Sequence, residues 1–511
     1  MKKITNSEQF CQDLLELDIK YAKAFANTVI ALSSYEDTKS VVGLSESPLF
    51  LHQYSSIRDG IHGVGLDEEE QSATMDSITE LGLKYLWKKK SYDADDWLIL
   101  QTDASGVKKG HSSCLKERQY IKISNNVIHT NKPISVGYPI SLVNVSIPPL
   151  SNKWSLPLNI CRISSSQSAV ECSVEQVNEL ICDKPKEGEK RGLLCNSRII
   201  NTLDSGYGCP AYISPTFKYE KLVNIIRFRY GKKVWIGVKH PPKKEENNDK
   251  KIGTPKIYGE KYYLIDNTQT KKYHRKGESY EVYQQSIFDL PYQDNIELSG
   301  KTSKGRQLKI VIHRWNDLLI RSKDGHNMKD KPFDIVASKV IDADTGELVF
   351  NKTMFTTIHG ELKNEISTKQ AFETYRHRYD IEPSIKFCKQ KLMLENYQTP
   401  DVQHFDNWLV IVMTAFWLLF TAAPDVKYQP KKWQQYKEKN KKASQQTDKE
   451  QVILSPCQTR QAAQALFLTF DSQPFTPQKS KKGQGREKDT TLYPRTRHKV
   501  VKKNRKNVNS S

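Results

Sequence analysis

Between about Pro215 and Ser367 the sequence alternates apolar and polar residues over many short runs. A period of two is typical of strands that bury one face and expose the other. Clusters of Gly, Pro, Asn and Asp separate the runs, as expected for turns between antiparallel strands. The sequence therefore predicts an antiparallel β region, whose expected strands are NIIRFRY, KVWIGV, KYYLI, YEVYQQSIF, LKIVIHRW, FDIVAS and LVFNKTMF.

Helical and strand patterns precede this region. Apolar residues recur at helical spacing through residues 1 to about 92, which predicts a helical N-terminal region. The runs SVGYPISLVNVSI and WSLPLNICRI then predict strands, and VEQVNELICD predicts a helix. After the β region, Trp408–Ala423 forms the most apolar run, WLVIVMTAFWLLFTAA. It is shorter than the roughly 20 residues that span a bilayer, so we expect a buried helix.

Two aspartates follow apolar runs upstream of the β region. WLILQTD predicts a short strand that ends on Asp103, and the run Ile199–Leu203 predicts a strand that ends before Asp204 and a glycine-containing turn. Such positions are common for metal carboxylates, although an aspartate can also simply cap a turn. Asp266 and Asp342 also follow apolar runs, but both lie inside the β region. We therefore favour Asp204.

A polar stretch follows the β region, TYRHRYDIEPSIKFCKQKLMLENYQT. Four of its residues stand out by type: Tyr375, Arg378, Glu382 and Lys389. The last three follow Tyr375 by three, seven and fourteen positions, and this spacing would place all four on one face of a continuous helix. A carboxylate can hold a divalent cation, and the cations and phenol can hold phosphates. The alternative is an ordinary solvated helix whose charges pair with one another.

Pro383 complicates this helix, because proline inside a helix removes a hydrogen bond and clashes with the preceding turn. Two arrangements are compatible with it. One is a kinked helix. The other is a break near Tyr379, with Asp380 as N-cap and Pro383 in the first turn of a new helix. In the second case Tyr375 and Arg378 need not share a face with Lys389.

The pattern Tyr-x2-Arg-x3-Glu-x6-Lys resembles the signature of bacterial insertion-sequence transposases with an Asp–Asp–Glu active site. The flanking text RYDIE, KQKL and NYQTPDVQHFDNW is similar to that family, and LDSGYG resembles its second aspartate motif. The resemblance covers about residues 90 to 425. It implies an α/β fold with a ribonuclease-H-like catalytic domain, in which a mixed sheet is flanked by helices and interrupted by an antiparallel β insertion.

The resemblance also implies a domain organisation and a set of catalytic residues. Asp103, Asp204 and Glu382 would be catalytic and would bind two Mg²⁺ ions per site, with Mn²⁺ as a possible substitute. Ala104 departs from the family, because many members have a second acidic residue there. Tyr375, Arg378 and Lys389 would bind DNA phosphates. The expected domains are a helical region at 1–92, the first part of the catalytic domain at 93–214, the insertion at 215–367, the second part at 368–424 and a basic tail at 425–511.

Charge supports a polyanionic partner. The chain has 79 Lys and Arg against 59 Asp and Glu, a formal charge of +20. The tail from Asp425 to Ser511 has 21 basic and 7 acidic residues, a difference of +14, and we expect it to be largely disordered without DNA. Basic and aromatic residues also alternate in the β region, including Arg227, Arg229, Trp235, Arg314 and Trp315. Together they suit contact with DNA, although each of them singly is equally well explained by a solvated β face.

The resulting hypothesis is metal-dependent cleavage at insertion-sequence ends, followed by strand transfer of the 3′-hydroxyl into target DNA. The partners would be double-stranded DNA with terminal inverted repeats and target DNA, and by resemblance the protein would form a homodimer on DNA. Nine cysteines without any CxxC pair and no apolar signal segment favour a cytoplasmic, nucleoid-associated protein with no membrane contact. The alternatives are a degenerate or recruited transposase that only binds DNA, and a ribonuclease-H-like nuclease without strand transfer.

Overall fold

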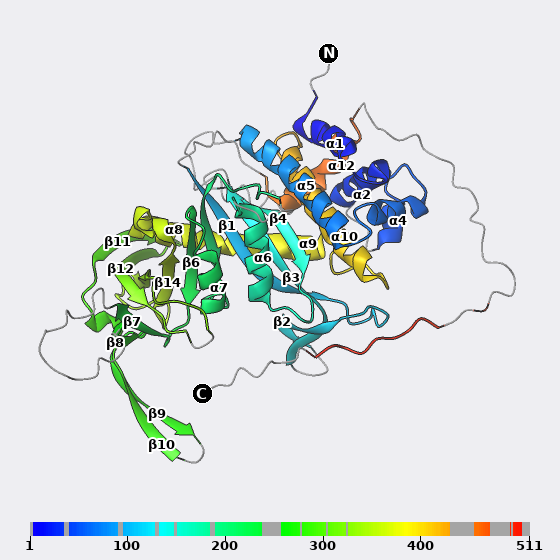
Figure 1. The fold of residues 1–511 in the computed structure, drawn as a ribbon. Coiled ribbons are helices and arrows are strands. Elements are labelled where there is room, and N and C mark those ends of the chain that lie inside the picture. Colours follow the sequence, from blue (N-terminus) through cyan, green and yellow to red (C-terminus); the bar gives the residue numbers. More distant parts are fainter. Residues whose placement is uncertain are drawn as a thin grey trace, which may run out of the picture. The chain divides into compact units, whose positions relative to one another are not determined.

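The structure is a computed structural model of the 511-residue chain. It forms two compact units, which are described separately (Figure 1). The first consists of Met1–Asp93, Ala104–Ala169 and Tyr379–Ser511, and the second of Ala94–Asp103 and Val170–Arg378. The structure describes residues 4–34, 40–89, 96–127, 132–147, 151–183, 190–237, 257–275, 278–302, 305–322, 325–429, 454–470, 491 and 494–502.

The first unit is built mainly from helices, which confirms the helical prediction for the N-terminal region. A side-chain cap fixes the start of the first helix, since Thr5 Oγ1 accepts a hydrogen bond of 3.1 Å from the backbone of Glu8. The helices of this unit are α1 (Asn6–Glu16), α2 (Ala22–Ser34), α3 (Val41–Leu44), α4 (Tyr54–His62), α5 (Glu68–Lys89), α9 (Ile381–Gln390), α10 (Val402–Ala422) and α12 (Pro456–Phe467).

Helix α10 lies at the centre of the first unit and confirms the predicted buried helix. By length and composition it could cross a membrane, but its most apolar stretch is entirely buried among the described residues. It contacts α1, α2, α4, α5, α12 and β4. The indole of Trp417 donates a hydrogen bond of 2.8 Å to the carbonyl of Pro157, and a Cβ on Gly82 would lie 2.5 Å from the Trp417 ring. A glycine in α5 is therefore required for this close packing.

The strands of the first unit are β2 (Gln119–Val127), β3 (Lys132–Ile147) and β4 (Ser151–Arg162). Strand β3 pairs antiparallel with both β2 and β4. The two strands predicted in this part of the sequence, β3 and β4, are confirmed, and β2 was not predicted. Strand β1 (Trp97–Lys108) continues through Asp103 to Lys108, so the prediction that this strand ends on Asp103 is wrong.

The second unit contains a mixed sheet. Strands β1, β5 (Arg198–Leu203) and β6 (Leu222–Phe228) are parallel. Strand β14 (Met354–His359) pairs antiparallel with β6, and the sheet continues through antiparallel strands in the order β13, β12, β7, β8, with β11 also paired to β12. Their bounds are β13 (Phe333–Asp342), β12 (Gln307–Leu319), β7 (Lys233–Gly237), β8 (Tyr258–Tyr263) and β11 (Asp294–Lys301).

These pairings test the predicted antiparallel β region. Each of its seven predicted runs overlaps an observed strand, but NIIRFRY forms β6, which runs parallel to β5. The sequence did not predict β11 or the strand β9 (Gln269–Arg275). Strands β9 and β10 (Glu278–Gln284) pair only with each other in the described chain.

Helices cover both faces of this sheet. Alternate residues of β6 point to opposite sides, since Ile226 joins an apolar cluster with α7 residues and Ile225 joins another with α8 residues. The sheet is therefore mixed and flanked by helices, as predicted for an α/β protein. The helices of this unit are α6 (Ala169–Ile181), α7 (Pro210–Thr216) and α8 (Thr368–Arg376), with the 3₁₀ segments η1 (Ile287–Asp289) and η2 (Glu361–Glu365).

A break separates α8 from α9, as the second of the two arrangements predicted. The 3₁₀ segment η3 (His377–Asp380) follows α8, and α9 begins with Asp380 as N-cap and Pro383 in the first turn. Proline is tolerated there because the first backbone amides of a helix have no intrahelical acceptor. The prediction that one continuous helical face carries all four polar residues is therefore wrong.

Parts of the basic tail belong to the folded first unit. Helix α12 begins with a capping box at Ser455 and contacts α2 and α10. Near the end of the chain, the backbone of His498 donates to the Ser113 carbonyl at 2.9 Å, and that of Val501 donates to the Arg118 carbonyl at 2.7 Å. Helix α12 confirms the helix that the run QTRQAAQALFLTF predicts within the tail. The expected disorder is wrong for the segment around His498 and Val501, and most of the remaining tail lies outside the described residues.

Candidate active site

Two of the predicted catalytic residues lie at neighbouring positions of the second unit. Strands β1 and β5 are parallel and in register up to Thr102 and Leu203. Asp103 is the next residue of β1, and Asp204 directly follows the end of β5. Asp204 begins a tight turn, in which its carbonyl accepts a hydrogen bond of 3.1 Å from the backbone of Tyr207. The parallel register therefore places the two aspartates at neighbouring positions, Asp103 within β1 and Asp204 directly after β5.

The phenol of Tyr207 interacts electrostatically with the carboxylates of both Asp103 and Asp204. Tyr207 is 4% exposed, and its hydroxyl is 3.3 Å from Ser173 Oγ. Its pKa is raised above the ordinary tyrosine value, chiefly by burial and further by the negative charges of Asp103 and Asp204, as well as Cys172. The phenol therefore stays protonated beside the carboxylate pair and can serve as a hydrogen-bond donor. No pattern in the sequence predicted a role for Tyr207.

A polar layer precedes the two aspartates: Thr102 comes directly before Asp103, and Thr202 and Asn201 come two and three residues before Asp204. Thr102 Oγ1 donates to Asn201 Oδ1 at 3.0 Å, and Asn201 Nδ2 donates to Tyr212 Oη at 2.9 Å. Thr202 Oγ1 donates to the Leu100 carbonyl at 3.0 Å. All of these side chains are buried. A satisfied buried network favours one arrangement of its strands, and here it fixes the β1–β5 register that aligns Asp103 with Asp204.

Arg378 forms an ion pair with Asp103. Its NH2 lies 3.1 Å from Asp103 Oδ2, and the two side chains are 9% and 19% exposed. The sequence predicted that Arg378 binds a DNA phosphate. In this structure the guanidinium instead compensates the charge of one candidate metal ligand. Tyr375, one turn earlier in α8, is 1% exposed and belongs to the apolar cluster that covers the sheet, so it packs as a core residue here.

Glu382 and Lys389 belong to the first unit. Glu382 is exposed in the first turn of α9, where the helix dipole favours a carboxylate. Lys389 Nζ donates to Ser105 Oγ at 2.8 Å and to the Gly106 carbonyl at 2.6 Å. The lysine predicted to hold a phosphate thus attaches α9 to the end of β1. DNA contact by Tyr375, Arg378 and Lys389 stays a prediction.

A second lysine makes a matching attachment that the sequence did not reveal. Lys109, which directly follows β1, is 1% exposed. Its Nζ donates to the carbonyls of Leu394 at 3.0 Å, Glu395 at 3.0 Å and Tyr397 at 2.5 Å. Burial lowers the pKa of Lys109 to about 7. Together, Lys109 and Lys389 fasten α9 and the segment after it to β1 residues of the same unit.

Arg314 and Trp315, two of the residues that suited DNA contact, are buried. Trp315 is fully buried in the apolar cluster beside α7, and Arg314 is 7% exposed. Arg227 and Arg229 are exposed, and Trp235 is half-buried. The interpretation as DNA contacts is therefore wrong for Arg314 and Trp315.

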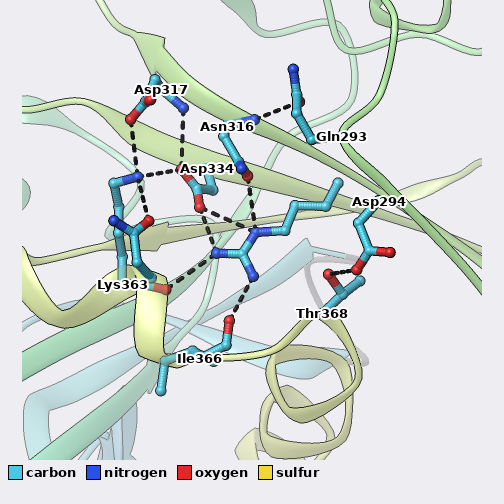
Figure 2. A network of polar contacts seen from close by, with 10 residues as sticks. Gln293, Asp294, Asn316, Asp317, Asp334, Lys363, Ile366 and Thr368 are labelled. Atoms are coloured by element: carbon cyan, nitrogen blue, oxygen red, sulfur yellow. Dashed lines mark hydrogen bonds and ion pairs between the residues drawn. The ribbon is translucent and has the colours of Figure 1, made fainter.

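Arg314 belongs instead to a buried ionic network (Figure 2). Its NH2 lies 2.5 Å from Asp334 Oδ2, while Lys363 Nζ lies 2.6 Å from Asp334 Oδ1 and 3.1 Å from Asp317. Arg314 NH1 also donates to the Ile366 carbonyl at 2.6 Å, immediately before the N-terminus of α8. The network therefore fixes the start of the helix that leads to Arg378.

The two alternative aspartates have structural partners. Asp266 contacts the Tyr230 hydroxyl at 3.2 Å, Lys339 at 3.4 Å and Thr353. Asp342 closes a turn by accepting hydrogen bonds from the backbone of Asp344 and Thr345, and it also pairs with Arg306. These donors lower the pKa of Asp342. Both aspartates therefore have structural partners within the β region.

The donor set fits a hard divalent cation in part. Asp103 and Asp204 supply carboxylate oxygens, which Mg²⁺ prefers. In the described residues, however, no three His, Cys, Asp or Glu side chains gather as a metal-binding group.

Comparisons with known proteins name no relative. A scan against models of protein families matches none of them, and no curated protein sequence matches the chain.

Proposed function

We propose that this protein is a DNA transposase that cleaves DNA at insertion-sequence ends and transfers the 3′-hydroxyl into target DNA. The observation that carries the proposal is the alignment of Asp103 and Asp204 on adjacent parallel strands, next to Tyr207. The Tyr–Arg–Glu–Lys pattern resembles the transposase signature, and it supplies Glu382 as the third carboxylate. We further propose that the protein is cytoplasmic and nucleoid-associated, and that it forms a homodimer on DNA.

The fold is compatible with this proposal. A ribonuclease-H-like domain requires a mixed sheet flanked by helices, and the second unit contains such a sheet, with parallel β1, β5 and β6. Helices α6 and α7 pack near one face and α8 covers the other. We assign the antiparallel strands that follow β6 to the insertion of that domain.

Each carboxylate has a defined role in the proposal. Asp103, Asp204 and Glu382 would hold two Mg²⁺ ions, or Mn²⁺ in their place. When bound, these ions would supply Lewis acidity for attack on a phosphodiester and would stabilise the leaving oxygen. The chain's own residues bind and orient the DNA. Arg378 carries a positive charge beside Asp103, where a phosphate would approach the site, and the Tyr207 phenol remains a neutral donor.

The test uses a supercoiled plasmid that carries the DNA flanking the coding region, incubated with purified full-length protein and Mg²⁺. We expect nicked and joined products from the wild type and none from Asp204→Asn, which removes a charge with little change in shape. Asp344→Asn, an exposed aspartate in a turn of the same unit, is the matched control and should retain activity. Equal activity of Asp204→Asn and the wild type would contradict the assignment of Asp204.

A second candidate function is DNA binding without catalysis. It is favoured by the Arg378–Asp103 ion pair, since this pair compensates one of the candidate ligands within the protein itself. Salt-dependent binding to DNA, with no nicked or joined product in either Mg²⁺ or Mn²⁺, would identify this function. Nicking without any joined product would instead indicate a nuclease of the same fold.

A further inference from the structure

The hairpin formed by β9 and β10 extends from the sheet of the second unit as a two-stranded ribbon (Figure 1). The strands pair antiparallel over seven residues each, from Gln269 opposite Gln284 to Arg275 opposite Glu278. In the described chain neither strand pairs with another sheet. Its residues are largely exposed on both faces. An isolated two-stranded hairpin is marginally stable in water, so its persistence requires support at its root.

Contacts with the end of β8 and the residues after it provide this support. The backbone of Tyr263 donates to the Gln285 carbonyl at 2.8 Å. Ser286 Oγ donates to the Ile265 carbonyl at 2.6 Å, and the Ser286 backbone donates to Thr268 Oγ1 at 2.7 Å. Ser286 and Ile265 are buried. The hairpin is therefore anchored to the packed part of the unit.

One face of the hairpin carries an ordered aromatic pair. The rings of Tyr273 and Tyr280 face each other across the strands, with centroids 5.7 Å apart and planes 17° apart. Gln284 Nε2 donates to Tyr273 Oη at 3.0 Å, and Gln284 Oε1 accepts from Gln269 Nε2 at 3.0 Å. This chain of hydrogen bonds holds Tyr273 in place, while Tyr280 is 46% exposed. The two tyrosines thus form a preorganised aromatic surface, whose ring positions are fixed before any partner binds.

A lysine on the same face adds a positive charge. Lys271 Nζ lies 5.5 Å from the centre of the Tyr273 ring, and Val282 stands opposite Lys271 on β10. On the other face, Lys272 stands opposite Glu281 and pairs with it at 3.3 Å. The two faces therefore differ in charge. The sequence from Gln269 to Gln284 has four Lys and Arg and two Glu, a formal charge of +2.

We propose that the hairpin is a binding arm for double-stranded DNA, with Lys271, Tyr273 and Tyr280 as its contact face. The major groove of DNA admits a two-stranded β-ribbon, a lysine can neutralise a phosphate, and tyrosine hydroxyls can donate hydrogen bonds to phosphate oxygens. The choice of DNA as partner rests on the proposed function. A second copy of the chain is disfavoured as the partner, because exposed lysines on strand edges oppose pairing between sheets.

The test compares substitutions on the two faces of the hairpin. Binding of the full-length protein to a mixed-sequence DNA duplex is measured over a series of salt concentrations, without divalent metal. Lys271→Gln should weaken binding and reduce the slope of log K against log salt by about 0.9, the value for one phosphate contact. Lys272→Gln is the matched control, because this lysine is already paired with Glu281, and it should change the slope less.

The aromatic residues provide a second comparison. Tyr280→Ala should weaken DNA binding about tenfold or more, the effect expected from loss of one hydrogen bond to a charged phosphate. Tyr283 lies on the other face, and its side chain is 63% exposed. Tyr283→Ala should therefore have a smaller effect on DNA binding. Both side chains lie outside the core, so we expect both variants to fold.

The possible outcomes separate this inference from the proposed function. Equal effects of Lys271→Gln and Lys272→Gln on binding would overturn the inference, and so would a wild type that does not bind the duplex. Loss of self-association in Lys271→Gln with unchanged DNA binding would also overturn it and identify a second copy as the partner. The proposed function is tested separately, by the formation of nicked and joined products. If the hairpin variants bind DNA like the wild type and still form these products, the inference about the hairpin is wrong and the proposed function stands.

Discussion

Replacing Asp334 by asparagine should strongly destabilise the second unit. The Asp334 carboxylate is fully buried and lies between two cations, Arg314 and Lys363, whose side chains are 9% and 8% exposed. It accepts hydrogen bonds of 3.1 and 2.5 Å from Arg314, 2.6 Å from Lys363 and 3.2 Å from the backbone of Asp317. An asparagine keeps the shape of the side chain but removes its negative charge.

The magnitude follows from the charges that remain. With Asp334→Asn, Lys363 keeps only the carboxylate of Asp317, which is 38% exposed, and the Asp334 carboxylate that pairs with Arg314 is gone. Removing one partner of a buried ion pair costs about 3 to 5 kcal/mol, because the other charge stays buried without compensation. The free energy of unfolding of a domain is only about 5 to 15 kcal/mol. We therefore expect Asp334→Asn to remove a large part of the stability of the unit.

Urea unfolding followed by tryptophan fluorescence measures this effect, because Trp315 is in the core of the same unit. Glu297→Gln is the control. Glu297 pairs with Lys309 at 2.8 Å, but both side chains are about half exposed, so its loss should cost less than about 1 kcal/mol. An Asp334→Asn variant no less stable than Glu297→Gln would refute the reasoning that this network holds the start of α8 on the sheet.

Two further predictions concern other buried positions. Burial, together with Lys232 and Lys363, lowers the pKa of His359 to about 3, so the unfolded chain takes up a proton that the folded chain does not. Stability should fall as pH decreases below about 6.5, by about 1.4 kcal/mol per pH unit for this residue, and the fall measured by urea unfolding should be smaller in His359→Gln. Gly82→Ala should destabilise the first unit by about 1 to 3 kcal/mol in thermal unfolding, since its Cβ would lie 2.5 Å from the Trp417 ring. Ser77→Ala, at a half-buried position of the same helix, should be nearly neutral, and a Gly82→Ala variant as stable as the wild type would show that the packing can adjust.

Local patterns predicted most elements of this fold. The apolar run in α10, the period-two runs of the β region and the break at Pro383 each follow from short-range physics of the chain. Pairing between strands did not follow, because the same β6 sequence is compatible with parallel or antiparallel neighbours. Strand β9 was missed because its sequence, QTKKYHR, is polar almost throughout.

The candidate site was predictable in its residue types but not in its contacts. Asp103 and Asp204 were singled out because each follows an apolar run in the sequence, and the parallel pairing of β1 and β5 places them at neighbouring positions. The buried partners of the lysines and arginines were not predictable. Arg314 and Lys109 look like surface residues in the sequence, and only folding brings Asp334 or backbone carbonyls to them. Long-range partners of this kind depend on tertiary structure, which periodicity does not encode.

The most direct test of the account is strand joining by the purified protein. A plasmid carrying the DNA that flanks the coding region is incubated with Mg²⁺, and products joined to target DNA are sequenced. The account predicts joined products from the wild type and from Asp344→Asn, and none from Asp103→Asn, Asp204→Asn or Glu382→Gln, although all three should still bind DNA. Joined products from any of these three variants at the wild-type level would contradict the assignment of that carboxylate to catalysis.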